Sequence, residues 1–405
     1  MKRQKSECTT ILDQSLVVSA PTGSGKTVVF ELAIVRFLEN LKTFNDIPYK
    51  IVYVAPMKAL CEERLVDWFP KFSNLGLNCI LVTGDTDNID FKNLTTHNLI
   101  ITTPEKWDTL TRKWRDCRSF VSSVKLFMID EVHLLNDDNR GPTVEVIVSR
   151  MKTIQSSLEY GLDTMNLRFI AVSATIPNVE DVAEWLSLPK VPAISYKFGN
   201  DMRPIKLKKV VYGYNYNSKL SNPFKFDLML NYKLQSIILQ HSEGKPTLIF
   251  CATRKNVEMT TKHLAEHLTI NLNTVQKQTL NEASMKLSQP KLKVALCHGI
   301  GFHHAGLSKD DRRIAEDVFR SGTLPVLIAT STLAMGVNLP AHLVIIKSTK
   351  HYQDGRYQDY SESMILQMIG RAGRAQFDTS ATAVILTTKL EKVRTFFFYE
   401  VPNRL

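Results

Sequence analysis

Cysteine is scarce in this chain of 405 residues, and its six cysteines are scattered along the sequence. None forms the C-x-x-C pair from which zinc ribbons are built, and their spacing indicates no disulfide framework. The sequence also has no uninterrupted apolar run of the roughly 20 residues that a membrane-spanning helix requires. These absences argue against a disulfide-stapled secreted domain and against a membrane partner. We therefore expect a soluble, intracellular protein in a reducing compartment.

Acidic residues are fewer than basic ones, 40 against 51, which gives a formal net charge of +11. A positive protein attracts polyanions such as a phosphate backbone. A basic surface without a ligand has the same composition, so the charge permits a nucleic-acid partner without establishing one. The 44% of hydrophobic and 22% of charged residues are typical of a folded protein. Because 405 residues exceed one ordinary core, we expect two domains.

Short apolar, β-branched runs alternate with longer segments of helical periodicity. This pattern predicts the α/β class, with parallel sheets covered by helices on both faces. A first series of runs comprises residues 16–18, 51–54, 99–101, 126–129 and 169–172, and a second comprises 248–250, 326–329, 343–346 and 383–386. Between the two series, prolines collect in residues 188–246, so we place a domain boundary near Arg203. The polar residues 271–295 predict a helical insertion or a mobile loop.

A glycine-rich segment follows the first apolar run and leads into a helical segment. It consists of Ala20, Pro21, Thr22, Gly23, Ser24, Gly25, Lys26 and Thr27. This is the strand, loop and helix context of a phosphate-binding loop, in which the glycines let the backbone curl and point its N–H groups inward. Lys26 would reach the β- and γ-phosphates of ATP, and the Thr27 hydroxyl would bind Mg²⁺. An ordinary glycine-rich turn is the alternative, unless a second strand delivers carboxylates.

Such a strand is present at residues 124–129, and it ends at Asp130 and Glu131. In open α/β sheets, ligands bind at the carboxyl ends of the strands. Asp130 would hold the magnesium ion directly or through water, and Glu131 would orient and deprotonate the attacking water. The two motifs together predict a nucleoside triphosphatase with ATP and Mg²⁺ as cofactors.

The chain resembles the superfamily 2 helicases, because further motifs follow in the order of that family. In the first domain these are Ala55-Pro56-Met57-Lys58, Thr83-Gly84-Asp85, Thr102-Thr103-Pro104-Glu105 and Ser173-Ala174-Thr175. In the second domain they are Phe250 to Arg254, Thr330 to Pro340 and Gln367 to Arg374. The resemblance implies two tandem RecA-like domains with parallel sheets and a catalytic cleft between them. It places the ATP-binding domain at 1–202, the helicase C-terminal domain at 203–388 and the start of a truncated following domain at 389–405.

The resemblance also implies residue roles. The nucleic-acid contacts would be Pro56, Lys58, Thr103, Pro104, Thr253, Arg254, His304, Thr330 and Thr332. Ser173 and Thr175 would couple hydrolysis to movement. Gln367, Arg371 and Arg374 would be catalytic, the arginines acting as fingers that reach the nucleotide held by the first domain when the domains close.

Three segments resemble the Ski-like group of these helicases, namely the Asp-Glu-Val-His box at 130–133, His303 to Gly306 and Gly336 to Pro340. Segments beginning at Arg150, Ala183 and Gln376 look closest to the meiotic crossover DNA helicases. That resemblance implies a nuclear, monomeric, ATP-dependent enzyme that unwinds DNA from 3′ to 5′, starts from a single-stranded tail and promotes crossovers between homologous chromosomes. An RNA-remodelling enzyme with the same motifs is one alternative, and a nucleic-acid-binding module without turnover is another.

The helicase resemblance also bears on a short window that could hold zinc. Cys297, His298, His303 and His304 are all possible ligands. The resemblance assigns the two later histidines instead to a structural motif on the nucleic-acid side.

A hairpin is predicted between the last two motifs, because Asp354-Gly355 is flanked by aromatic residues. Ski-like DNA helicases carry a strand-separating hairpin at this point in the chain. Tyr352 and Tyr357 would stack on the last base pair, and Lys350 and Arg356 would contact phosphates. A plain surface turn is the alternative.

The two ends of the chain depart from the family pattern. Only 19 residues precede the phosphate loop, where the family has an adenine-reading element, and the chain ends at Leu405, where the family continues into further domains. We therefore expect an incomplete adenine pocket, with weak discrimination among ATP, GTP and CTP. A fragment, a splice product and an incomplete gene prediction remain open explanations.

Overall fold

A computed structural model describes residues 13–41, 48–84, 94–137, 140–157, 166–174, 176, 178–189, 191–216, 222–336, 339–353, 355–374 and 377–395. The chain divides into two compact units, Met1–Arg203 and Pro204–Leu405. The sequence predicts a first domain at 1–202 and a second at 203–388.

The first unit is built on a seven-stranded parallel sheet with the strand order β3-β4-β2-β5-β6-β1-β7. Its strands are β1 (Leu16–Ser19), β2 (Lys50–Val54), β3 (Cys79–Val82), β4 (Leu99–Thr102), β5 (Val124–Asp130), β6 (Arg168–Ser173) and β7 (Ile194–Lys197). Its helices are α2 (Lys26–Leu41), α3 (Lys58–Ser73), α5 (Pro104–Thr111), α6 (Arg118–Ser122), α7 (Gly141–Ser156) and α8 (Val179–Leu186), with short 3₁₀ turns η1 (Val132–Asn136) and η2 (Asn200–Met202).

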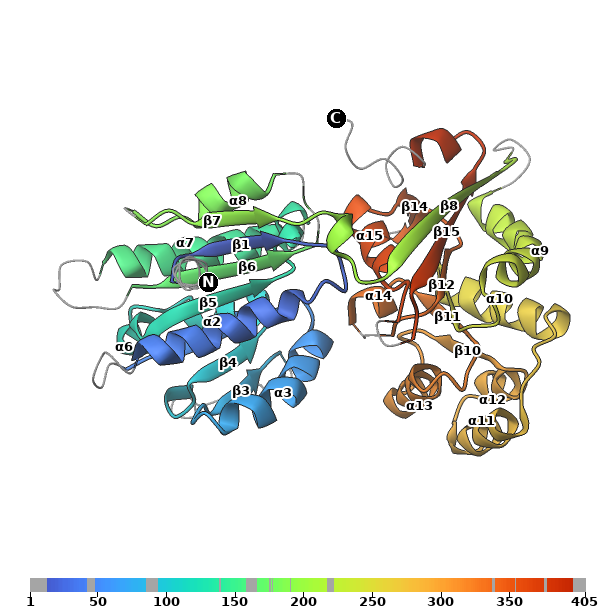
Figure 1. The fold of residues 1–405 in the computed structure, drawn as a ribbon, viewed down its shortest axis with the longest axis horizontal. Helices are drawn as coiled ribbons and strands as arrows, with labels where there is room; N and C mark the ends of the chain where they lie inside the picture. Colours follow the sequence, from blue (N-terminus) through green and yellow to red (C-terminus); the bar gives the residue numbers. More distant parts are fainter. Residues whose placement is uncertain are drawn as a thin grey trace. The chain divides into compact units, whose positions relative to one another are not determined.

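Alternate side chains of this sheet enter two different cores. Val17 packs on the face that α5 to α8 cover, whereas its neighbours Leu16 and Val18 pack with α2 and α3 on the other face (Figure 1). Trp68 of α3 and Trp107 of α5 are fully buried, one on each face. Because the central strands are buried on both sides, they show the continuous apolar runs from which they were predicted.

The second unit contains a six-stranded parallel sheet with the order β10-β11-β9-β12-β15-β8. Its strands are β8 (Lys206–Tyr214), β9 (Thr247–Cys251), β10 (Ile300–His303), β11 (Val326–Thr330), β12 (Leu343–Ile346) and β15 (Ser380–Thr388). Its helices are α9 (Pro223–His241), α10 (Arg254–His267), α11 (Thr274–Lys286), α12 (Pro290–Cys297), α13 (Lys309–Arg320), α14 (Thr332–Gly336) and α15 (Glu362–Gly370).

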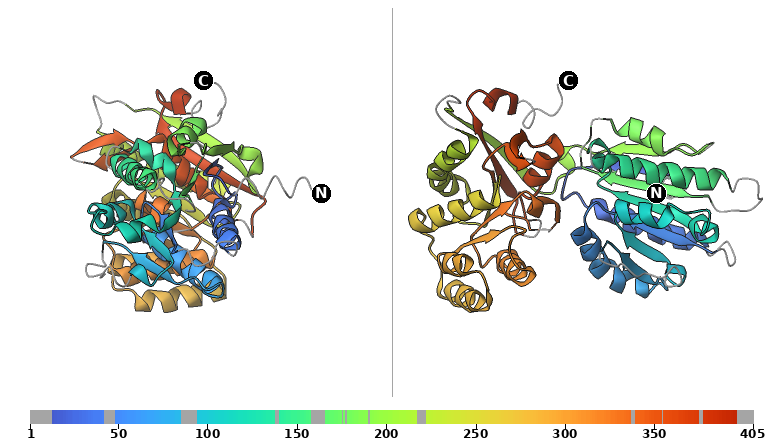
Figure 2. Two further views of the ribbon diagram at one scale, coloured as in Figure 1. Left: turned by 90° about the vertical axis from the view of Figure 1, so that its left-hand side faces the viewer. Right: turned by 180° about the vertical axis from the view of Figure 1, so that it is seen from behind.

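Helices α11 and α12 occupy the segment predicted as a helical insertion or a mobile loop, so the helical alternative is the correct one. They pack against each other in every view (Figure 1 and Figure 2). Asn273 caps α11 through a capping box with Gln276, which explains why a polar segment forms a stable helix here.

A buried ion pair lies in the interior of the second unit. Lys347, which follows β12, is fully buried, and its Nζ lies 2.6 Å from Oδ2 of Asp227 on α9. The same ammonium donates to Oγ1 of Thr260 on α10 at 2.9 Å. The pair therefore joins the sheet to two of the helices that cover it.

The predicted fold class is confirmed, since both units are parallel α/β sheets covered by helices. Within the parts of the chain that the structure describes, none of the helices is long and apolar enough to cross a membrane.

Candidate nucleotide site and nucleic-acid surface

The residues predicted to bind nucleotide lie at the carboxyl ends of neighbouring strands of the first sheet. The phosphate loop follows β1, and Asp130 and Glu131 end β5, with β6 between these two strands. A hydrogen bond from the Ala20 N–H to the Ser173 carbonyl (3.1 Å) ties the start of the loop to the end of β6. Parallel strands thus bring together side chains that are more than 100 residues apart in sequence.

The phosphate loop has the backbone that its glycines were predicted to permit. Gly23 and Gly25 both have φ of 85°, a region that L side chains rarely adopt, and each has open space where a Cβ would stand. Ser24 closes the loop, because its hydroxyl donates to the Pro21 carbonyl at 2.7 Å. The Nζ of Lys26, the first residue of α2, is buried and has no hydrogen-bond partner among the described residues. A buried ammonium of this kind needs an anion as partner.

Asp130 lies in a crowded position and is only partly exposed. Its Oδ2 accepts a hydrogen bond of 2.5 Å from the Tyr53 hydroxyl on β2, and its Oδ1 accepts one of 2.9 Å from the Glu131 N–H. Burial raises the pKa of Asp130 to about 6, and the neighbouring charge of Glu131 adds to this rise, while the Tyr53 hydrogen bond and the charges of Lys26 and Arg64 oppose it. A carboxylate whose ionised form is so disfavoured is ready to accept a cation.

Glu131 adopts a left-handed backbone conformation, with φ of 53° and ψ of 48°, and η1 begins directly after it. Its Oε2 lies 3.3 Å from Nδ1 of His133, and the same nitrogen lies 3.1 Å from the Ser173 hydroxyl. Burial lowers the pKa of His133, so this imidazole stays neutral at pH 7. His133 thus links the carboxylate pair to the segment predicted to couple hydrolysis to movement. Thr175, the other residue of that prediction, lies outside the described residues.

Together these features fit a magnesium–nucleotide complex. The buried Lys26 ammonium and the curled loop would take the phosphates, and Thr27 and Asp130 would hold the metal ion. Tyr53 and Arg64 belong to the same environment, but sequence reasoning missed them. They lie on β2 and α3, and no local pattern marks their contact with a residue on β5.

The predicted nucleic-acid contacts of the first unit lie at two other strand ends of the same sheet edge. Pro56 and the exposed Lys58 follow β2, and Thr103 and Pro104 begin α5 after β4. The Thr103 side chain is buried and accepts a hydrogen bond from the N–H of Lys106, so it caps α5. Both segments therefore lie at the N-terminus of a helix, where backbone N–H groups favour phosphate.

Arg140, which the sequence analysis did not single out, connects these two segments. Its Nη1 donates to the Pro56 carbonyl at 2.7 Å, and its Nε lies 3.7 Å from the carboxylate of Glu105 on α5. Arg140 comes shortly after η1 in the chain. It therefore joins the segment after Glu131 to both predicted nucleic-acid segments.

The second unit repeats this arrangement at three adjacent strand ends. Thr253 and Arg254 follow β9, His304 follows β10, and Thr330 and Thr332 flank the end of β11. The Thr253 side chain caps α10, and the hydroxyls of the other two threonines lie 2.9 Å apart.

His304 is buried, and its Nδ1 accepts a hydrogen bond from the Gly306 N–H. Its Nε2 faces Glu258 at 3.6 Å. A side chain on Gly306 would contact both His304 and Arg254, so glycine allows their close approach. Nε2 of the neighbouring His303 donates to the Glu316 carboxylate at 2.8 Å. Across the described residues no group of three or more His, Cys, Asp or Glu side chains could hold a metal ion.

The predicted hairpin is present as β13 (Lys350–Gln353) paired with β14 (Arg356–Asp359), and Gly355 in its turn has φ of 81°. Tyr352 and Tyr357 face each other across the strands, with ring centroids 5.2 Å apart. Tyr352 is 52% exposed, and Tyr357 is partly buried. Asp354 lies outside the described residues.

One cation of the hairpin is already paired. Nζ of Lys350, predicted to contact phosphate, lies 3.1 Å from Glu391 and 3.8 Å from Asp359.

Gln367, Arg371 and Arg374 lie on and directly after α15. Arg371 donates from Nε and Nη2 to the Ala334 carbonyl on α14. Arg374 instead contacts a carboxylate, that of Asp378.

Comparison with known protein families gives two matches. Residues 1–182 match the DEAD/DEAH box helicase family, and residues 229–376 match the helicase conserved C-terminal domain. One match lies in each unit, and the resemblance to the superfamily 2 helicases is confirmed.

Several curated proteins are similar to most of the chain. Probable ATP-dependent DNA helicase HFM1 of Mus musculus is 54% identical over 381 residues, which are 93% of this chain and 26% of that protein. ATP-dependent DNA helicase MER3 of Saccharomyces cerevisiae is 43% identical over 378 residues, 93% of this chain and 30% of that protein. Activating signal cointegrator 1 complex subunit 3 of Mus musculus is 40% identical over 393 residues, which are 94% of this chain and 17% of that protein. The chain thus spans between a sixth and a third of these relatives.

Proposed function

We propose that this chain is the ATP-hydrolysing part of a DNA helicase. The observation that carries the proposal is the meeting of two features at one sheet edge. One is a phosphate loop with a buried Lys26 ammonium that has no hydrogen-bond partner among the described residues, and the other is the Asp130–Glu131 pair. Neither feature stabilises the fold on its own, because each leaves charge buried. A bound magnesium–nucleotide complex would compensate both.

The proposal gives each residue of this site a task. Gly23, Gly25 and Lys26 bind the β- and γ-phosphates of ATP, while Thr27 and Asp130 hold Mg²⁺, which would neutralise charge on the phosphates when bound. Glu131 orients the attacking water and takes its proton. Through His133, Ser173 would sense the state of this site, which supports its assignment to coupling.

In the second unit the proposal assigns Gln367, Arg371 and Arg374 to the catalytic set. The arginines would stabilise the charge of the transferred phosphoryl group. The helix N-termini after β2, β4, β9 and β11 would bind the phosphate backbone of the nucleic acid. The paired tyrosines of the hairpin would stack on bases.

DNA is the proposed nucleic acid, because relatives between 42% and 54% identical carry the name DNA helicase. By the same similarity we propose unwinding from 3′ to 5′, starting from a single-stranded tail, in meiotic crossover formation, and a place in the nucleus. The net charge of +11 suits any nucleic acid and does not decide between DNA and RNA.

Two variants separate nucleotide binding from hydrolysis. Lys26→Ala should abolish binding of a fluorescent ATP analogue, because the main positive charge on the phosphates is lost. Glu131→Gln should bind the analogue as the unmodified protein does, while kcat for ATP falls by about 10²–10⁴-fold, the usual contribution of a general base.

Glu180→Gln provides a matched control, since Glu180 is exposed on α8 and lies outside this site. It should leave both properties unchanged. An undiminished kcat in Glu131→Gln would show that another group takes the proton.

The choice of nucleic acid is tested by ATPase stimulation. Single-stranded DNA should stimulate phosphate release more than RNA of the same length and sequence. Stronger stimulation by RNA would replace the proposal by an RNA-remodelling enzyme, and stimulation by neither would favour a binding module without turnover.

A further inference from the structure

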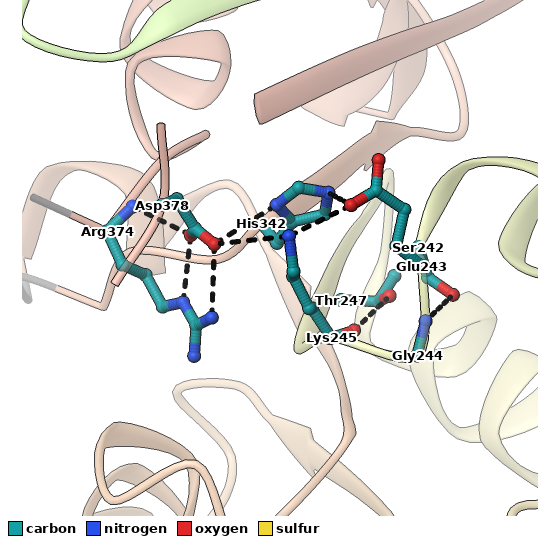
Figure 3. Close-up of polar contacts among 8 residues, drawn as sticks. All are labelled: Ser242, Glu243, Gly244, Lys245, Thr247, His342, Arg374 and Asp378. Carbon is teal, nitrogen blue, oxygen red and sulfur yellow. Dashed lines mark hydrogen bonds and ion pairs between the residues drawn. The ribbon is translucent and has the colours of Figure 1, made fainter. Parts of the chain in front are cut away.

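The carboxylate of Asp378 lies fully buried beside the last motif of the second unit. Its Oδ2 accepts hydrogen bonds from the backbone N–H of Arg374 (3.1 Å) and from Nε of the same residue (2.9 Å), and its Oδ1 accepts one from Nη2 (3.2 Å; Figure 3). Three hydrogen bonds from one arginine, two of them from the guanidinium, form a bidentate grip. Such a grip fixes the direction of a side chain that is otherwise flexible.

Two further groups hold the carboxylate in place. The buried imidazole of His342 approaches Oδ1 of Asp378 through Nδ1 at 3.2 Å, and Nδ1 must be the donor, because an ionised carboxylate only accepts. Nζ of Lys245 lies 3.9 Å from the same oxygen. Glu243 in turn approaches Nε2 of His342 at 3.6 Å and Nζ of Lys245 at 2.9 Å (Figure 3). His342 and Lys245 thus contact the same carboxylate that accepts hydrogen bonds from Arg374.

The grip uses only one edge of the guanidinium. Nε and Nη2 point at Asp378, and no hydrogen bond of Nη1 is found among the described residues. The Arg374 side chain is 19% exposed, and the ring of Phe377 lies 5.2 Å from the guanidinium carbon. Since a guanidinium carries five N–H donors, the Nη1 edge is left to bind a second anion.

Arg371, the other arginine assigned to catalysis, contacts a backbone carbonyl. It donates to the Ala334 carbonyl, which is a neutral acceptor. Arg374 donates to a charged acceptor, the carboxylate of Asp378.

We infer that Asp378 is a positioning residue for Arg374, fixing the direction of its guanidinium and leaving the Nη1 edge to bind a phosphate anion. The inference rests on the proposed function, in which Arg374 stabilises the charge that develops during hydrolysis. Because the carboxylate of Asp378 also interacts with His342 and Lys245, it orients Arg374 without completely neutralising the positive charge of the guanidinium. Asp378 itself touches neither substrate nor metal in this scheme.

A purely structural role is the competing explanation. Asp378 also closes a turn, since its N–H donates to the Arg374 carbonyl at 2.9 Å, and loss of the carboxylate could disturb the chain locally. The two explanations differ in one respect. A positioning residue matters to catalysis only while Arg374 is present.

The test is a double-mutant cycle on nucleic-acid-stimulated ATPase. Arg374→Ala should lower kcat by about 10³-fold, the scale of an arginine finger. Asp378→Asn should lower kcat by about tenfold, with KM for ATP nearly unchanged, because the amide keeps one acceptor but turns an N–H toward the guanidinium. In the Arg374→Ala background, Asp378→Asn should change kcat by less than about twofold.

Asp317→Asn is the matched control. The exposed side chains of Asp317 and Arg320 on α13 pair at 2.9 Å, so loss of Asp317 removes an arginine–carboxylate pair without touching this cluster. It should leave kcat unchanged.

Asp378→Glu covers the case in which the asparagine variant does not fold. It keeps the charge and shifts it by one methylene group, and it should show the same dependence on Arg374. Thermal melting followed by circular dichroism confirms that each variant is folded.

Each remaining outcome contradicts the inference. An unchanged kcat in folded Asp378→Asn, an equal loss in the presence and absence of Arg374, or loss of folding in both Asp378 variants would show that Asp378 is structural or dispensable. If Arg374→Ala itself keeps full activity, this positioning role fails while the proposed ATPase stands or falls separately on Glu131→Gln.

Discussion

Replacing Lys347 by methionine should destabilise the second unit far more than any surface change. Methionine has a similar length but no charge, so Asp227 would remain as a buried carboxylate. Its Oδ1 has no hydrogen-bond partner among the described residues, and Lys347 supplies the cation at Oδ2. Breaking one partner out of a buried ion pair costs about 3–5 kcal/mol. For a unit of this size, that loss lowers the melting temperature by about 6–20 °C.

The distribution of tryptophan makes the assay specific for each unit. All four tryptophans of the chain lie in the first unit, at Trp68, Trp107, Trp114 and Trp185. Tryptophan fluorescence therefore follows unfolding of the first unit, whereas far-ultraviolet circular dichroism follows both. In Lys347→Met, the part of the dichroism transition that belongs to the second unit should move to lower temperature, and the fluorescence transition should stay in place.

Two further variants sharpen the measurement. Replacing both partners, with Lys347→Met and Asp227→Leu, should restore most of the stability, because no charge is left buried. Lys262→Met is the control, since Lys262 is 78% exposed and its pair with Glu266 spans 3.9 Å, and it should shift stability by less than about 1 kcal/mol. If Lys347→Met melts like the unmodified protein, the buried pair contributes nothing and the reasoning is wrong.

Two other predictions concern the hairpin and the acid limb of stability. Replacing Tyr352 and Tyr357 by alanine should reduce duplex unwinding strongly and leave single-strand-stimulated ATPase nearly intact, since each lost base-stacking contact is worth about 1–3 kcal/mol. The control Tyr232→Ala, at an exposed tyrosine on α9, should change neither activity. Equal loss of both activities in the double variant would indicate a structural role for Tyr352 and Tyr357. The hydrogen bond from Arg36 holds the pKa of Asp13 below its ordinary value. Asp13 therefore stabilises the first unit at a pH above its unfolded-state pKa. This contribution is lost as the pH falls through the lower pKa of Asp13 in the folded protein. Asp13→Asn should flatten the acid limb of a fluorescence-monitored stability curve, and an unchanged limb would contradict the assignment.

The sequence predicted the central strands of both sheets but not their edges. The strands without a predicted apolar run are β3 and β7 in the first sheet and β10 and β8 in the second, and each lies at an edge. A central parallel strand is buried on both faces and shows a continuous apolar run, whereas the edge strands β3, β7 and β8 are partly solvated. The edge strand β10 is buried, but Gly301 and His303 interrupt its apolar run. In β8, Lys206 and Lys208 are exposed and interrupt the pattern, and the strand fell within the segment interpreted as a boundary.

The candidate site also contains some residues that the sequence predicted and others that it could not predict. Local motifs predicted Lys26, Asp130 and Glu131, because each motif is contiguous and the strand and helix around it can be recognised. Tyr53 and Arg140 could not be predicted, because their contacts with Asp130 and Pro56 join segments 77 and 84 residues apart. Contacts of this kind follow from the order of the strands in the sheet, which the sequence alone does not reveal.

The left-handed backbone of Glu131 sets activity against stability at this position. A side chain at positive φ costs roughly 1–2 kcal/mol relative to glycine, and the protein carries this cost whether or not nucleotide is bound. Glycine at this position would relax the backbone and stabilise the first unit, but it would remove the carboxylate assigned to the attacking water. Under the proposed function, selection for stability alone would favour an inactive enzyme, and selection for turnover would retain glutamate here.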